Sequence, residues 1–147
     1  MKIKTILYFL IILNSLSLFS CSQETDIDAL NNRLDELEDV VKQHQTNKIS
    51  DFFAKNFTTT RYPNKAKFLL FARYQLKRNK NISIVIIDKE TIKNNTAFDV
   101  TFRVLLVGSN SFLPERGQMY NVASRWIKED SRWMISRLRW EKFNANE

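Results

Sequence analysis

The chain has 147 residues, a formal net charge of +7 and a single cysteine. It is long enough for one domain of ordinary size, and one cysteine excludes any disulfide within the chain. Only two glycines and two prolines are present, which leaves little room for disordered linkers. Eleven phenylalanines, four tyrosines and three tryptophans can supply a core or an apolar pocket.

Charge is divided between two parts of the chain. Residues 24–39 carry a net charge of −6, and residues 40–147 carry a net charge of +11. A basic domain can bind nucleic acid, but the export signal described next argues against such a partner, and none is expected. Anionic lipid headgroups are the better candidate partners, and a solvated basic surface is the simplest explanation.

The N-terminal segment has the features of a secretory signal. Two lysines precede an apolar stretch over residues 6–19, which ends two residues before Cys21. A membrane-spanning helix needs roughly 20 residues, so a cleaved signal is favoured over an anchor. The sequence LFSC that ends at Cys21 resembles a bacterial lipoprotein box. The alternative is a plain secretory signal followed by a free cysteine.

The lipoprotein resemblance implies a location in the bacterial cell envelope. Cys21 would be the site of lipid attachment, and Ser22 after it favours the outer membrane, with the protein facing the periplasm. We therefore expect a lipoprotein signal peptide over residues 1–20 and a short tether over 21–25. A single domain over 26–142 and a C-terminal tail over 143–147 would follow.

Three helices are predicted in the first half of the domain. Apolar residues at spacings of three and four predict a helix over 26–44, with its stripe formed by Ile27, Leu30, Leu34, Leu37 and Val41. Packing of this stripe on its own domain is favoured over a short coiled-coil dimer. A second helix is predicted over 48–56 and a third over 63–79, where Pro63 suits the first turn.

From Ile82 onward the apolar period changes from 3.6 to 2, which predicts strands. We place them over residues 82–87, 96–107, 118–128 and 132–141, with tight turns at Asn94-Asn95 and at residues 129–131. In the second strand the apolar face is formed by Phe98, Val100, Phe102, Val104 and Leu106. The predicted fold class is α+β, with three N-terminal helices packed on a curved antiparallel four-stranded sheet.

The order of these elements resembles the nuclear transport factor 2-like (SnoaL-like) superfamily, which has a cystatin-like cone. The segment WIKEDSRWMI over residues 126–135 is similar to the last hairpin of that superfamily. The segment FLPERGQMY over residues 112–120, with RWE at 139–141, resembles uncharacterised bacterial envelope members. The resemblance implies the fold over residues 26–142, and it says little about function because this fold carries many activities.

No catalytic residue is visible in the sequence. Enzymes of the superfamily keep an Asp, His or Tyr inside the cone, but the apolar face of the second strand carries no acid or base. Asp99 and Arg103 lie on its opposite face, as a surface ion pair. The only histidine, His44, is interpreted as an exposed or capping residue near a helix end. No ligand set for a metal is present, and no cofactor is expected.

A few aromatic residues are candidates for lining a pocket. They are Tyr74, Phe98, Phe102, Tyr120 and Trp126, with ordinary core packing as the alternative. Arg137 and Arg139 share the parity of Trp133 in the last strand. We predict a mixed face there, apolar at its start and solvated at its end, and a bulge would change such parity.

Two functions follow as hypotheses. The first is an envelope lipoprotein whose non-enzymatic domain binds a small apolar ligand or an envelope protein, with a homodimer implied by the resemblance. The alternative is a pocket enzyme, a hydrolase, dehydratase or isomerase that acts on an apolar small molecule. A third reading, a component of a secretion system, has no distinguishing motif.

Overall fold

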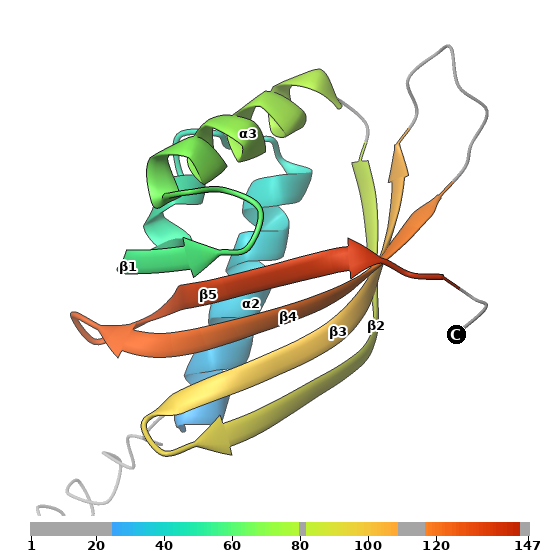
Figure 1. Cartoon of the computed structure of the whole chain (residues 1–147). Helices are drawn as coiled ribbons and strands as arrows, with labels where there is room; N and C mark the ends of the chain where they lie inside the picture. The colour runs from blue at the N-terminus through green and yellow to red at the C-terminus, as the bar shows by residue number, and fades with distance from the viewer. Residues whose placement is uncertain (1–24, 80–81, 109–116, 145–147) are drawn as a thin grey trace, which may run out of the picture.

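A curved five-stranded sheet carries two helices on one face (Figure 1). The structure is a computed structural model, and it describes residues 25–79, 82–108 and 117–144. The elements in chain order are α2 (Asp26–Lys42), the 3₁₀ helix η2 (Ile49–Phe52), β1 (Phe53–Thr59), α3 (Lys65–Arg78), β2 (Ile82–Asn94), β3 (Ala97–Gly108), β4 (Gln118–Glu129) and β5 (Arg132–Lys142). The described core lies between the sheet and the helices and is formed entirely by residues from Leu30 onward.

The sheet has the strand order β1-β5-β4-β3-β2. Strand β1 runs parallel to β5, and all other neighbours are antiparallel. The α+β class is confirmed, but the expected three helices and four antiparallel strands are not. The second helix is only a 3₁₀ turn, and the segment after it is a fifth strand.

Strand β1 corrects the helix predicted over residues 48–56. The prediction rests on Ile49, Phe52 and Phe53, whose spacing of three and then one residue fits a helix face, and all three are buried. The deciding interaction is the backbone pairing of Phe53 with Ile135, which comes from a strand far along the chain. Local periodicity carries no information about such a partner, and tertiary pairing overrides it.

Strand β2 is longer than predicted, because it continues past Ile87 to Asn94. Its register with β3 shifts between Ile87 and Glu90, and Asp88 within the shift has a φ of 52°. A bulge of this kind bends a strand and increases its twist. Both predicted hairpins are present, with positive φ at Asn95, Asp130 and Ser131. The first turn lies at Asn95-Thr96, one residue later than predicted, because Asn94 still pairs with Ala97 as the end of β2.

Strand β5 also contains a bulge, and it decides which side chains face the helices. Pairing shifts between Arg125 opposite Arg137 and Trp126 opposite Ile135. Before the bulge Trp133 and Ile135 are buried; after it Leu138 and Trp140 pack against the core, while Arg137 and Arg139 are exposed. The mixed face predicted for this strand therefore resolves into an apolar inner face and two outward arginines.

Helix α2 packs its apolar stripe on its own domain. Leu30, Leu34 and Val40 are buried in the core, and Leu37 and Val41 are partly buried against it. Ile27, the first residue of the predicted stripe, does not join the core and is 38% exposed. Thr25 caps the helix: its side-chain oxygen accepts a hydrogen bond from the backbone N–H of Asp28 at 3.2 Å.

A buried arginine connects this helix to two other elements. The Arg33 guanidinium donates to the carbonyl oxygen of Asp51 at 2.5 Å and to that of Trp133 at 3.4 Å. It also lies 3.8 Å above the ring of Phe52 and pairs with Glu36 at 2.5 Å. One side chain thus joins α2, η2 and β5.

We expect Arg33→Ala to lower the free energy of unfolding by about 2 to 3 kcal/mol. The substitution removes charge-assisted hydrogen bonds and takes the guanidinium donor away from two carbonyl oxygens. Urea denaturation followed by circular dichroism measures this. The control is Arg132→Ala, an exposed arginine, whose loss should stay within about 0.5 kcal/mol. Equal effects for the two variants would contradict a structural role for Arg33.

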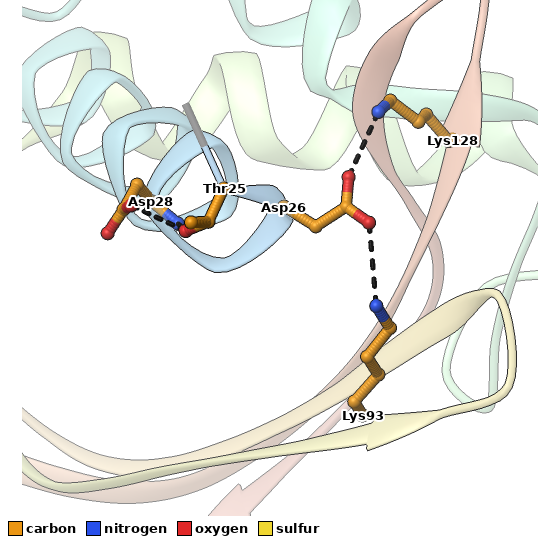
Figure 2. A network of polar contacts seen from close by, with 5 residues as sticks. All are labelled: Thr25, Asp26, Asp28, Lys93 and Lys128. Atoms are coloured by element: carbon orange, nitrogen blue, oxygen red, sulfur yellow. Dashed lines mark hydrogen bonds and ion pairs between the residues drawn. The ribbon is translucent and has the colours of Figure 1, made fainter. Parts of the chain in front are cut away.

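The N-terminus of α2 is held against the sheet by a second polar cluster (Figure 2). The Asp26 carboxylate accepts from the Lys128 amine at 3.0 Å and from the Lys93 amine at 3.5 Å. The hydrogen bond from Lys128 is the main cause that lowers the pKa of Asp26, and Lys93 lowers it further. These lysines come from the ends of β4 and β2, so the cluster fixes the start of the helix beside two hairpins.

The lowered pKa of Asp26 predicts a pH-dependent contribution to stability. A depressed pKa stabilises the fold above the unfolded-state pKa, near pH 4, and that stabilisation is lost as the pH falls through the folded-state value. Asp26→Asn should therefore be less stable than the parent at pH 7, and the difference should vanish in acid. Urea midpoints from pH 2.5 to 7 test this. The control Asp35→Asn, on an exposed position of the same helix, should change the free energy of unfolding at pH 7 by less than about 0.5 kcal/mol.

Candidate functional site

A cavity of about 500 Å³ lies between the inner face of the sheet and the two helices. Its walls are largely aliphatic and aromatic. Helix α2 contributes Leu34, Leu37 and Val41; α3 and its neighbours contribute Phe68, Phe71, Ala72, Gln75, Leu76 and Asn79; and the sheet contributes Phe53, Phe102, Val104, Leu106, Tyr120, Val122, Ser124, Trp126, Ile135, Leu138 and Trp140, with Ile49 of η2 beside them.

The alternation of the strands places these residues. Phe102, Val104 and Leu106 occupy every second position of β3, and their partners in β4 are Val122, Tyr120 and Gln118. Residues that pair across strands lie on the same face. The apolar face predicted for this strand is therefore the inner face of the sheet.

Deep in the cavity, the polar groups bond to each other. The Trp126 indole N–H donates to the Ser124 hydroxyl at 3.0 Å, and that hydroxyl donates to the carbonyl oxygen of Val100 at 3.2 Å. Trp126 is 1% exposed. These bonds fix the indole in one orientation, so it forms a rigid part of the wall rather than a free polar contact.

Two other polar lining residues, Gln75 and Asn79, lie at the C-terminus of α3. The Asn79 side-chain amide donates to the backbone oxygen of Gln75 at 2.9 Å. The Asn79 carbonyl lies 2.7 Å from Nε2 of His44, which has a φ of 56°. His44 thus links the end of α2 to the end of α3, a more specific role than the capping one expected from the sequence.

Three of the five predicted pocket residues line this cavity: Phe102, Tyr120 and Trp126. Phe98 does not, because it is 3% exposed and packs edge-to-face on Trp133 with ring centroids 4.9 Å apart. Tyr74 lies outside as well: it is 57% exposed on α3, since the cavity side of that helix is taken by Phe71, Ala72 and Gln75. Contact of the three lining residues with a ligand stays a prediction.

Tyr120 is the one titratable side chain among the described lining residues. Asp99 and Arg103 are on the outer face, as predicted, but each pairs with another residue: Asp99 with Arg125 at 3.6 Å, and Arg103 with Asp88. Within the described ranges, no group of three or more His, Cys, Asp or Glu side chains could hold a metal ion.

A second hollow adjoins the cavity. It shares Phe71, Tyr120 and Trp140 with the cavity and extends outward to Arg61, Asn121, Glu141, Lys142, Phe143 and Asn144. We call this hollow the vestibule. Tyr62 stacks on Phe71 with centroids 5.0 Å apart and on Trp140 at 6.3 Å. Tyr62 lines neither space, but these contacts fix the positions of two of the three shared rings.

The helical part of the lining and the whole vestibule are not predicted from the sequence. Leu34, Leu37 and Val41 belong to the apolar stripe of the first helix, but periodicity does not tell a packed face from a cavity wall. Arg61 lies between the predicted helices over 48–56 and 63–79, and nothing in its sequence neighbourhood indicates that it lies 5.3 Å from the ring of Trp140.

The proposed lipid attachment site, Cys21, lies outside the described residues, as does the signal segment before it. Of the helices that the structure describes, none is both long and apolar enough to cross a membrane.

No family model matches this chain, and no curated protein matches it. Solved structures do. A candidate dehydratase of the nuclear transport factor 2-like family from Streptomyces avermitilis has a TM-score of 0.72 at 10% identity, over 82% of this chain and 97% of that one. A Bdellovibrio bacteriovorus protein, Bd1075, has a TM-score of 0.68 at 11% identity over 80% of this chain, which spans only 40% of that protein.

A third similar structure is a candidate calcium/calmodulin-dependent protein kinase II association domain from Xanthomonas campestris. Its TM-score is 0.68 at 9% identity, and the match covers 82% of this chain and 90% of that one. At these identities the likeness concerns the fold and not the activity. The described part of the chain therefore has the nuclear transport factor 2-like fold that the sequence resemblance implied.

Proposed function

We propose that this domain is a binding module that holds a small apolar molecule in its central cavity. The observation that carries the proposal is the cavity itself, about 500 Å³ with mostly aliphatic and aromatic walls. Protein interiors normally contain few voids larger than a water molecule, whereas ligand sites of 300 to 1,000 Å³ with apolar walls and a few polar groups are typical. The volume and lining fit a binding site better than a packed core.

The cavity walls favour binding over catalysis. Among the described lining residues, the deep polar groups of Ser124 and Trp126 bond to each other, and Tyr120 alone carries a titratable proton. General acid–base catalysis needs such a group within hydrogen-bond reach of the substrate. A binding role needs only shape and apolar contact.

The second candidate is a pocket enzyme, such as a dehydratase or isomerase. It is favoured by the candidate dehydratase from Streptomyces avermitilis, which has the same fold, and by the position of Tyr120 in the cavity wall. In that case the Tyr120 hydroxyl would be the acid or base. This candidate ranks second because no lining partner for that hydroxyl is described.

The proposal includes a location in the bacterial cell envelope. The apolar N-terminal stretch and the LFSC sequence support lipid attachment at Cys21, with the domain held at the outer membrane and facing the periplasm. Two or more acyl chains give stable anchoring, whereas one gives only marginal binding. A homodimer belongs to the same proposal, supported by the Xanthomonas campestris association domain of like fold.

The cavity predicts that residues 22–147, which contain every described element, bind a neutral apolar dye such as Nile red. Leu106→Trp should weaken this binding about tenfold, because the indole fills part of the cavity. The matched control is Leu105→Trp, the neighbouring half-buried residue on the outer face, which should change binding less than about twofold. Fluorescence titration measures both, and urea midpoints verify folding.

Native mass spectrometry of the same chain reports its oligomeric state and any co-purified molecule. A dimer, or a bound mass lost in Leu106→Trp but kept in Leu105→Trp, supports the proposal. A ligand-free monomer that also fails to bind the dye would refute both the apolar-ligand site and the dimer.

The proposed lipid attachment predicts that Cys21 incorporates a fatty-acid label. The full chain is expressed in a Gram-negative host supplied with an alkyne analogue of palmitate. Cys21→Ala should lose the label and leave the membrane fraction, because no other cysteine is present. Ser22→Ala is the control and should keep the label. Retention of the label by Cys21→Ala would exclude lipid attachment at this residue.

A further inference from the structure

The vestibule gives the cavity a chemically distinct mouth. The cavity is lined by apolar walls, but the vestibule adds Arg61 and Lys142 within one continuous surface, since both spaces share Phe71, Tyr120 and Trp140. A molecule that fills the cavity and extends past these three rings would meet cationic groups next.

The sheet register decides which charges face that mouth. Lys142 pairs with Tyr120, and both therefore lie on the inner face. Glu141 also lines the vestibule, and it pairs with Asn121 on the outer face of the sheet. The vestibule lining thus carries two cations and one carboxylate, a net charge of +1, with Lys142 on the cavity side.

Both cations are available to a ligand. Among the described residues, neither Arg61 nor Lys142 forms a side-chain ion pair, and both are exposed. The Arg61 guanidinium lies 5.3 Å from the centre of the Trp140 ring. This cation–π contact holds the guanidinium at the junction of the two spaces while leaving its donors free.

We infer that the natural ligand is an anionic amphiphile, with its apolar chain in the cavity and its carboxylate or similar head between Arg61 and Lys142. This inference rests on the proposed apolar-ligand function and adds the ligand class. A cationic amphiphile would be repelled at the same place. A neutral one would fill the cavity without using either side chain.

The test is isothermal titration of residues 22–147 with dodecanoate, dodecanol and dodecyltrimethylammonium, each below its micellar concentration. The double variant Arg61→Gln/Lys142→Gln should bind dodecanoate about tenfold more weakly, because two partly exposed ion pairs are lost. Its affinity for dodecanol should change less than about twofold, since the cavity is intact. High salt should reduce the dodecanoate difference.

The control is Lys48→Gln/Lys67→Gln, which removes the same net charge from exposed positions outside the cavity and vestibule. It should leave the affinity for all three probes unchanged. An equal loss of dodecanoate affinity in this control, or no loss in the Arg61/Lys142 variant, would overturn the inference and leave the binding function standing. If none of the three dodecyl probes binds to the parent chain, the proposed function itself fails. Urea midpoints show whether each variant is as stable as the parent chain. The single variants Arg61→Gln and Lys142→Gln show how much each side chain contributes to the affinity for dodecanoate.

Discussion

The cavity depends on how helix α2 is held beside the sheet. Apolar contact is non-directional and favours closing a void, so it does not by itself fix a spacing. Directional bonds fix the distance between the helix and the sheet. Asp26 binds lysines of two strands, and Arg33 binds the carbonyl groups of Asp51 and Trp133. His44 contacts the carbonyl of Asn79. These three attachments, at the start, middle and end of the helix segment, set the position of one cavity wall.

The opposite wall depends on an irregularity in the sheet. The bulge between Ile135 and Arg137 changes which residues of β5 face the cavity. Without this bulge, Arg137 would continue the inner face begun by Trp133 and Ile135, and a buried charge would be costly. With it, Leu138 and Trp140 complete the apolar lining, and the arginines belong to the outer surface. The same shift brings Lys142 to the inner face at the mouth.

The sequence predicted what local periodicity encodes. It gave the stripe of α2, the alternation of β3, both hairpin turns and three of the cavity residues. The prediction was wrong at β1, because the helical spacing of Ile49, Phe52 and Phe53 carries no information about the long-range pairing of β1 with β5. The parity of β5 after its bulge could not be predicted either, since a bulge has no signature there. The vestibule was missed for the same reason: Arg61 and Lys142 meet only through tertiary packing around Trp140.

The two ends of the domain differ in what they carry. The Asp26 cluster lies at the Lys128 end of β4, and the mouth lies at the Tyr120 end of the same strand. Eight residues of strand separate them, about 26 Å at roughly 3.3 Å per residue. The proposed tether of residues 21–25 reaches at most about 17 Å. If Cys21 carries a lipid, as proposed, the anchor and the mouth therefore lie at opposite ends of β4, and an upright domain would hold its mouth away from the membrane surface.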